Sequence, residues 1–223
     1  MKSHNGYLEK KNSGTHIIGM NDAEYQSRDF SVTNYPQDTK EVGQMRSLEY
    51  MQREQGTIES LLEMLDHSSR RIENGKDVPP YMLKEIIELL QIYIEVSHRM
   101  REELILSLLG SRGMDAPNQE CTEIHDTLKK HERFLLRVVE AYDLGYQGAK
   151  GVFAHYAKQY ISILRQHLKL QNDLLSMWIE DQEQRDAELL KEFKKLDGGV
   201  KKTRERGMIR METLKKELRT VAA

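Results

Sequence analysis

Three histidines and one glutamate occupy positions from which helical segments of this chain would direct them toward a common interior. His98 and Glu102 are four residues apart, so they lie on one face of a helix. His131 and His167 each belong to the apolar stripe of a later segment. Imidazole and carboxylate groups that meet between helices are typical ligands of non-haem iron. The pattern therefore predicts a metal site shared by several helices.

The remaining histidines lack this placement. His125, for example, precedes His131 by six residues, which turns it about 120° around a helix of 3.6 residues per turn. We expect five histidines to be ordinary surface or boundary residues: His4, His16, His67, His125 and His155.

A metal-free interpretation of the three inward histidines stays open at this point. One histidine on an apolar stripe is more often a hydrogen-bonded core residue than a ligand. Three of them near one carboxylate are harder to explain in this way, because each unpaired buried imidazole or carboxylate costs several kcal/mol. Shared ligation of a cation would remove that cost.

Four long helices are needed to position these side chains. Apolar residues recur at spacings of three, four and seven from Met45 onward, which is typical of helices with one buried face. The first predicted helix ends at Asn74-Gly75, and the second begins at Pro79-Pro80. Two more follow on either side of a glycine-containing stretch at 145–151. The pattern predicts an all-α fold, an up-down-up-down four-helix bundle.

The predicted organisation has three parts. Residues 1–43 mix glycine, serine and asparagine without an apolar period, so we expect a disordered N-terminal arm. Residues 44–197 form the bundle with a short closing helix, which we expect to break at Asp197-Gly198-Gly199. Residues 198–223 form a basic C-terminal helical extension, whose thin apolar stripe packs on the bundle or on a second copy of the chain; binding of this basic helix to anionic lipid or nucleic acid is the alternative. Self-association through this helix is therefore one of the predicted partnerships.

Composition excludes several classes of function. With 31% charged and 7% aromatic residues in 223, the chain fits long amphipathic helices better than a sheet protein. No stretch approaches the roughly 20 apolar residues of a membrane span, and the first residues lack a signal-peptide core, so we expect a cytoplasmic protein. The net charge of -2 argues against nucleic acid as a partner of the whole chain. Cys121 is the only cysteine, which excludes an internal disulfide and a cysteine-based zinc or iron–sulfur site.

Taken in order, these segments resemble the hemerythrin-like family, whose HHE domains bind cations. The resemblance spans Leu48 to Leu196 and depends on the order of four short segments. They are the stretch from Ser97 to Leu104 with its His-x-x-x-Glu spacing, Leu128 to Glu132, Tyr160 to His167, and Asp186 to Phe193.

The resemblance implies a non-haem iron centre used for oxygen binding, or for iron or redox sensing. In the family this centre holds two iron ions. The implied ligand positions are Gln55, His98 and Glu102 for one metal, and His131, His167 and Gln171 for the other.

Two of these positions depart from the family pattern. Gln55 stands where the family has a histidine, and Gln171 and Asn172 stand where it has an acidic residue. A neutral amide oxygen is a poorer donor to a divalent cation than imidazole or carboxylate. We therefore expect one or two iron ions, with dioxygen as a further ligand.

Two other functions compete with this prediction. A metal-free bundle would act as an interaction scaffold, because glutamine amides can donate to and accept from imidazoles in a hydrogen-bonded core. A ferritin-like oxidase would need Glu-x-x-His on two helices, and Glu95 to His98 is the single instance. We therefore do not expect an enzyme.

Overall fold

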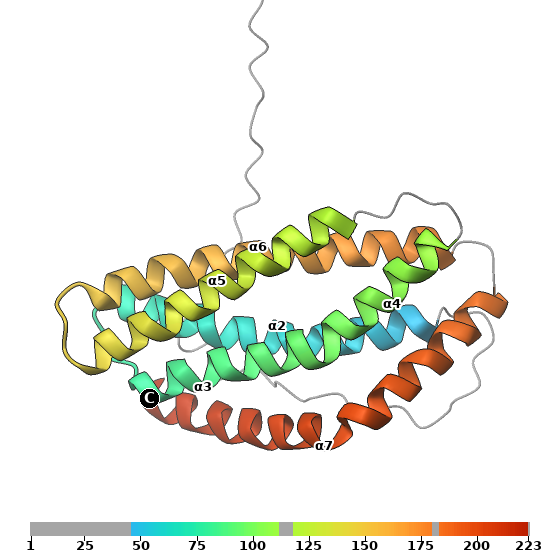
Figure 1. Cartoon of the computed structure of the whole chain (residues 1–223). Coiled ribbons are helices and arrows are strands. Elements are labelled where there is room, and N and C mark those ends of the chain that lie inside the picture. The colour runs from blue at the N-terminus through green and yellow to red at the C-terminus, as the bar shows by residue number, and fades with distance from the viewer. Residues whose placement is uncertain (1–45, 112–117, 180–182, 223) are drawn as a thin grey trace, which may run out of the picture.

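Helices and the turns between them make up the part of the chain that the structure describes. The computed structural model describes residues 46–111, 118–179 and 183–222 (Figure 1). Within these ranges there is no β-strand, so the predicted all-α class is confirmed. The N-terminal arm predicted for 1–43 lies outside the described residues.

The helices follow the predicted order along the chain. Their bounds are Arg46–Glu73 (α2), Pro80–Gln91 (α3), Arg99–Gly110 (α4), Asn118–Asp143 (α5), Ala149–Ile179 (α6) and Glu183–Ala222 (α7). The π-helical segment Ile92–His98 (η1) joins α3 to α4 without a break.

Local sequence explains the turn between α2 and α3. The chain leaves α2 through Gly75, which has a φ of +75°, a conformation that glycine adopts without steric cost. The amide of Lys76 donates to the carbonyl of Arg71 at 2.9 Å, satisfying a carbonyl that the ending helix leaves free. Pro80 then begins α3, where a missing N–H costs nothing.

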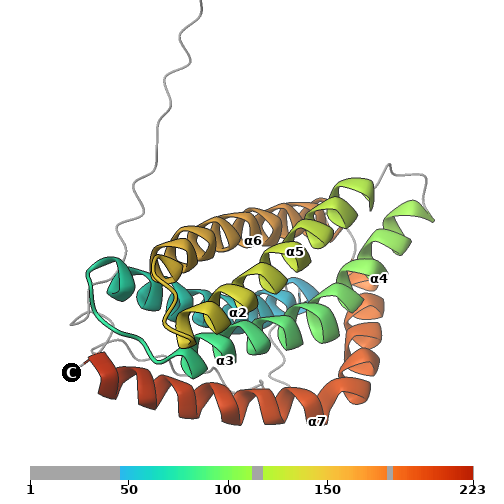
Figure 2. The ribbon, with the colours of Figure 1, turned by 60° about the vertical axis from the view of Figure 1, so that its left-hand side comes forward.

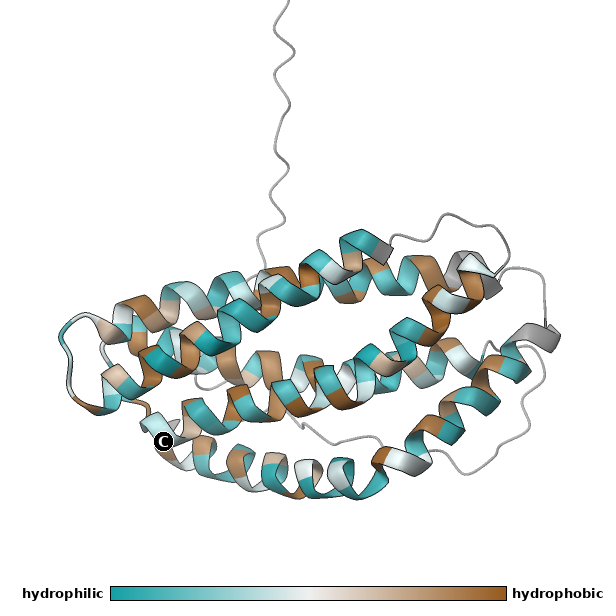
Figure 3. Cartoon of the chain, in the orientation of Figure 1, coloured by the Kyte–Doolittle hydropathy of each residue, from teal (hydrophilic) through white to brown (hydrophobic). Residues whose placement is uncertain are grey.

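The long helices pack side by side. α2 contacts α6, α7 and α3, while α5 contacts α6 and α3. Figure 1 shows α5 beside α6 and α7 along the edge below α3. Polar and apolar residues alternate along each helix in Figure 3, as expected for helices with one buried face.

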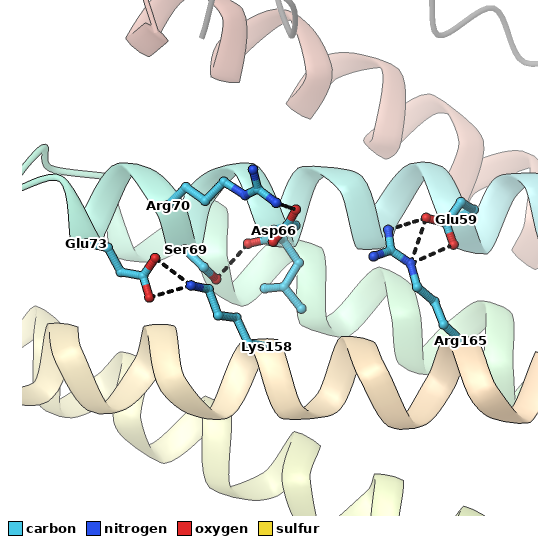
Figure 4. Close-up of polar contacts among 8 residues, drawn as sticks. Glu59, Asp66, Ser69, Arg70, Glu73, Lys158 and Arg165 are labelled. Carbon is cyan, nitrogen blue, oxygen red and sulfur yellow. Dashed lines mark hydrogen bonds and ion pairs between the residues drawn. The ribbon is translucent and has the colours of Figure 1, made fainter. Parts of the chain in front are cut away.

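Ion pairs link the outer edges of α2 and α6. Figure 4 shows Arg165 beside Glu59, with Nε donating at 3.0 Å, and Lys158 beside Glu73 at 2.7 Å. All four side chains are 29% exposed or more, and exposed pairs contribute little net stability. They align the two helices, while apolar burial supplies most of the packing energy.

A polar layer separates two apolar clusters in the core. The larger cluster includes Ile58, Ile94 and Leu168, and the smaller one includes Met51 and Ile105. Between Met51 and Ile58, and between Ile94 and Ile105, the buried residues are polar: Glu54, Gln55, Ser97, His98, Arg101 and Glu102. The polar residues of the other helices that meet them are His125, His167 and Gln171, of which His167 directly precedes Leu168. Buried polar groups at one level of a helical core need partners or a ligand.

The helix α7 runs through the predicted break at Asp197-Gly198-Gly199, so that prediction is wrong. Figure 2 shows that α7 bends instead of ending. The Asp197 carboxylate contacts Arg204 on the same helix and Arg101 on α4, and these contacts offset the low helix propensity of glycine. Beyond the bend, the apolar stripe of α7 packs into the larger cluster of the same chain, through Met211, Leu214 and Leu218.

The start of α7 also caps the first turn of α2. The Asp186 carboxylate accepts hydrogen bonds from the backbone amides of Arg46 and Ser47, at 3.0 and 2.8 Å, and from the Ser47 hydroxyl at 2.5 Å. A carboxylate at a helix N-terminus satisfies free amides and complements the helix dipole.

We expect Asp186→Ala to lower the free energy of unfolding by about 1–3 kcal/mol, because buried donors lose their acceptor. Urea denaturation followed by circular dichroism measures the change. Glu188→Ala on the same helix is the matched control, since Glu188 is exposed. Equal stabilities of the two variants would show that the cap contributes nothing.

Candidate metal centre

Glu102, His125 and His167 come together inside the polar layer. One ligand atom from each lies within 4.8 Å of the other two, and all three residues are at most 5% exposed. Nε2 of His125 lies 2.5 Å from one oxygen of Glu102, and Nε2 of His167 lies 3.2 Å from the other. Among the described residues this is the one group of histidine, cysteine and acidic side chains with ligand geometry.

Each member of this group comes from a different helix. Glu102 lies in the first turn of α4, His125 in α5 and His167 in α6. The π-helical segment η1 ends at His98, directly before the turn that carries Glu102. A π-helical segment rotates the residues that follow it relative to a continuous α-helix, and such segments are frequent at functional sites.

The distances between the donor atoms of Glu102, His125 and His167 are compatible with a shared ion, provided that one hydrogen bond is replaced by the ion. Donor atoms bound to one ion at about 2.1 Å lie roughly 3.0 to 3.4 Å apart in octahedral or tetrahedral geometry. The 3.2 Å between Glu102 and His167 meets this condition. The 2.5 Å between Glu102 and His125 is a direct hydrogen bond, so an ion would have to replace it.

Several buried atoms of the layer lack a hydrogen-bond partner within the described ranges. Those nearest the group are both ring nitrogens of His98 and of His167, Nδ1 of His125 and Oε1 of Glu102, and the layer also includes Nε2 of Gln171, Oε2 of Glu54 and Nε of Arg101. Nε2 of His167 lies 3.2 Å from Oε1 of Glu102, as an ion-pair contact and not as a hydrogen bond. Unsatisfied buried donors and acceptors are costly, and imidazole and carboxylate are the donor types that transition metals bind. The residues present therefore fit a divalent transition-metal ion.

The electrostatics of the group favour an anionic Glu102. Burial alone would raise the pKa of this carboxyl, but the contacts from His125 and His167 outweigh burial and lower the pKa far below its usual range. An ionised carboxylate is the protonation state of this residue that binds a metal ion.

His98 lies next to the group as a neutral imidazole. Its ring is edge-on to that of His167, with centroids 5.7 Å apart, and it is fully buried. Burial lowers the pKa of His98 to about 3, the nearby His167 adds to this effect, and Glu102 opposes it.

The other predicted ligands have different surroundings. His131 is half-buried, with Nδ1 3.0 Å from the carbonyl of Thr127 and its ring 6.2 Å from that of Tyr156. It does not join the group formed by Glu102 and His167. Its neighbour Glu132 takes the buried position, where it accepts a hydrogen bond from Tyr160 at 2.8 Å.

The two predicted glutamine ligands bind each other. The Gln55 amide donates to the Gln171 oxygen at 3.2 Å, and the Gln55 oxygen accepts from Asn172 at 2.7 Å. A glutamine oxygen that accepts from an amide in this way is not directed at a metal ion. This amide network links α2 to α6 within the polar layer.

His125 was expected at the surface, and that expectation is wrong because the buried stripe of α5 differs from the predicted one. Cys121, His125 and Leu128 are buried at spacings of four and three, and the stripe continues through Glu132 and Leu135. The spacing of Cys121, His125 and Leu128 can be seen in the sequence. Because Glu132 on the same face is polar, apolar periodicity did not identify that face as the buried one. Of the other histidines expected at the surface, His67 is buried on α2 and His155 is exposed, while His4 and His16 lie outside the described residues.

Comparisons with models of protein families, with curated proteins and with solved structures find no match to this chain. The function must therefore be argued from the residues of the site.

Proposed function

We propose that this protein binds one non-haem iron ion through Glu102, His125 and His167, and uses it to sense or bind dioxygen, redox state or iron. The observation that carries the proposal is the buried convergence of two imidazoles and one carboxylate within 4.8 Å. Two histidines and one carboxylate form a ligand set that is typical of non-haem iron(II), and it leaves coordination positions open for a small ligand such as dioxygen.

The donor set supports one ion in preference to two. A second ion would need further anionic or imidazole donors, and the predicted ones are otherwise engaged. His131 contacts Thr127, and Gln55 is hydrogen-bonded to Gln171. Glu102 is the one carboxylate in the group, so a second divalent charge would lack compensation.

The proposal includes a hemerythrin-like bundle with up-down-up-down topology and a cytoplasmic, non-enzymatic role. It is supported by the side-by-side packing of the helices and by the place of the site between them. None of the described helices combines the length and apolar character needed to cross a bilayer.

A metal-free scaffold is the second candidate, and the amide network favours it. The bonds among Gln55, Gln171 and Asn172 stabilise this part of the layer without an ion. In that case the paired Glu102 and His125 would also be structural.

Iron content tests the proposal directly. We expect the wild-type protein, loaded anaerobically with ferrous iron and desalted, to retain about one iron per chain, and Glu102→Gln to lose most of it, because the amide removes the anionic donor. Elemental analysis measures both. Glu103→Gln is the matched control, since Glu103 is the next residue on α4 and is 63% exposed.

Two outcomes would contradict the proposal in different ways. A wild-type protein without iron, whose melting temperature ignores added iron, would favour the metal-free scaffold. Full iron retention in Glu102→Gln would place the iron elsewhere on the chain.

A further inference from the structure

An open cavity lies along the end of α3 and the π-helical segment η1, away from the proposed metal site. Its volume is about 640 Å³, which is within the range of small-molecule sites in proteins. Figure 1 shows α3 between α5 and α7, and both of these helices pack against α3 and line the cavity. Three lining residues, Ile92, Glu95 and Val96, belong to η1, and π-helical segments are frequent at functional sites.

Most charges at the rim of this cavity are paired with each other. Arg210 of α7 donates to Glu85 at 2.5 Å and to Glu88 at 3.0 Å. Lys129 of α5 lies 3.1 Å from Glu95. The five side chains are 28% to 38% exposed, so water also solvates them. Each of these rim charges therefore already has a counter-charge.

Glu132 differs from the rim residues because it lines the cavity from a buried position. It is 3% exposed, and one of its oxygens accepts a hydrogen bond from the Tyr160 hydroxyl at 2.8 Å. Within the described ranges, no lysine or arginine forms an ion pair with it; the nearby Lys129 pairs with Glu95 instead. Burial raises the pKa of the Glu132 carboxyl, and hydrogen bonding from Tyr160 and Gln91 opposes this effect without reversing it. The anionic form of Glu132 therefore lacks a counter-charge that a bound cation could supply.

The other lining groups define the rest of a suitable ligand. Ile92 and Val96 are half-buried and give the cavity an apolar surface. Arg133 also lines the cavity, but it is exposed to water and its Nε donates to the carbonyl of Lys129 at 3.2 Å. A ligand anion close to Glu132 would be repelled by the carboxylate. The lining therefore fits a molecule with a cationic head and an apolar body.

We propose that this cavity binds a small aliphatic amine in its protonated form, with the ammonium group donating to Glu132 and the hydrocarbon chain packing on Ile92 and Val96. The inference does not rest on the proposed metal site. Glu132 follows His125 by seven residues on α5, which corresponds to roughly 10 Å along the helix axis.

Three six-carbon probes that differ in their head group test the proposal: hexylamine, hexanoic acid and hexanol. At neutral pH they carry an ammonium, a carboxylate and a hydroxyl group. In an NMR titration of the labelled full-length chain, we expect hexylammonium to shift the amide signals of the cavity-lining residues until they saturate. Hexanoate and hexanol should bind at least about tenfold more weakly, because neither can provide the charged hydrogen bond to Glu132.

A substitution at Glu132 tests the role of its charge. We expect Glu132→Gln to weaken hexylammonium binding by about tenfold or more, because the amide is neutral. Glu140→Gln is the matched control on the same helix; Glu140 is exposed, so its replacement should change the affinity by less than about twofold. The amide oxygen of Glu132→Gln can still accept from Tyr160, and the melting temperature checks that the fold is intact. If this variant fails to fold, the wild-type titration with the three probes still decides the question.

Several results would overturn the inference. They are the absence of saturable shifts with hexylammonium, equal or tighter binding of hexanol or hexanoate, and an unchanged affinity in Glu132→Gln. The variant His125→Ala should bind hexylammonium as the wild type does. Loss of iron from that variant with unchanged amine binding would show that the two sites are independent, so that failure of one proposal is distinguishable from failure of the other.

Discussion

Replacing Arg101 with methionine is expected to lower the free energy of unfolding by about 3–5 kcal/mol, because it leaves buried carboxylate charge without its partner. The Arg101 side chain is 1% exposed and forms ion pairs with Glu54 and Asp197. One of its nitrogens also donates to the Ser97 hydroxyl at 2.8 Å. Urea denaturation of the purified variant measures the loss.

The surroundings of Arg101 explain why the effect is large. Its guanidinium carbon lies 5.5 Å from the Tyr50 ring centroid and 5.8 Å from that of Phe193, distances at which cation–π attraction contributes. Glu54 is 2% exposed, and burial raises the pKa of its carboxyl despite Arg101. Removing the arginine therefore leaves Glu54 to be buried as an unpaired anion or protonated, and both cost free energy.

Arg53→Met is the matched control. Arg53 is 36% exposed and lies 3.8 Å from Glu49 on the same helix, so its replacement should change stability by less than about 0.5 kcal/mol. Similar losses in the two variants would mean that the buried network does not join α2, α4 and α7 as described. The double variant Glu54→Leu with Arg101→Met should recover part of the loss, because no unpaired Glu54 charge then stays buried.

The second large effect distinguishes two histidines of α5. We expect His125→Ala to reduce the affinity for ferrous iron by about 100-fold, because a ligand is lost, and His131→Ala to change it by less than about threefold. Equilibrium dialysis with ferrous iron under anaerobic conditions measures both affinities. The comparison is stringent, since the two residues lie on one helix, six positions apart.

Opposite results would contradict the geometry. Loss of iron in His131→Ala with retention in His125→Ala would favour the ligand set that the sequence pattern predicted. His155→Ala is a further control, because His155 is exposed and contacts Gln159 on its own helix.

Much of the helical architecture could be predicted from the sequence. Apolar periodicity and the Asn74-Gly75 and Pro79-Pro80 signals predicted the first turn, which the structure contains between α2 and α3. Such signals act locally, so they can be recognised without knowledge of the tertiary structure. The continuation of α7 through Gly198-Gly199 is accompanied by a contact of Asp197 with the distant Arg101, which periodicity does not encode.

The site was only partly predictable for a related reason. Glu102 and His167 were recognised as inward-facing residues, and they lie together. The choice between His125 and His131 depended on which face of α5 is buried, and that face includes a polar residue, Glu132, that pairs with Tyr160. When the buried face of a helix includes polar residues, apolar spacing alone does not identify that face.

The sequence also did not predict how the helix formed by α3, η1 and α4 is turned about its own axis. The π-helical segment at 92–98 has no recognised sequence signature, although it changes which residues share a face with His98. The engagement of Gln55 with Gln171 likewise follows from the packing of α2 on α6.

Anomalous X-ray scattering from a crystal of the iron-loaded protein, recorded on both sides of the iron absorption edge, tests the central claim most directly. We predict one peak of iron density roughly 2 Å from the Glu102 carboxylate and from the ring nitrogens of His125 and His167. Iron density at another place, or its absence from a crystal whose protein carries iron by elemental analysis, would contradict the account.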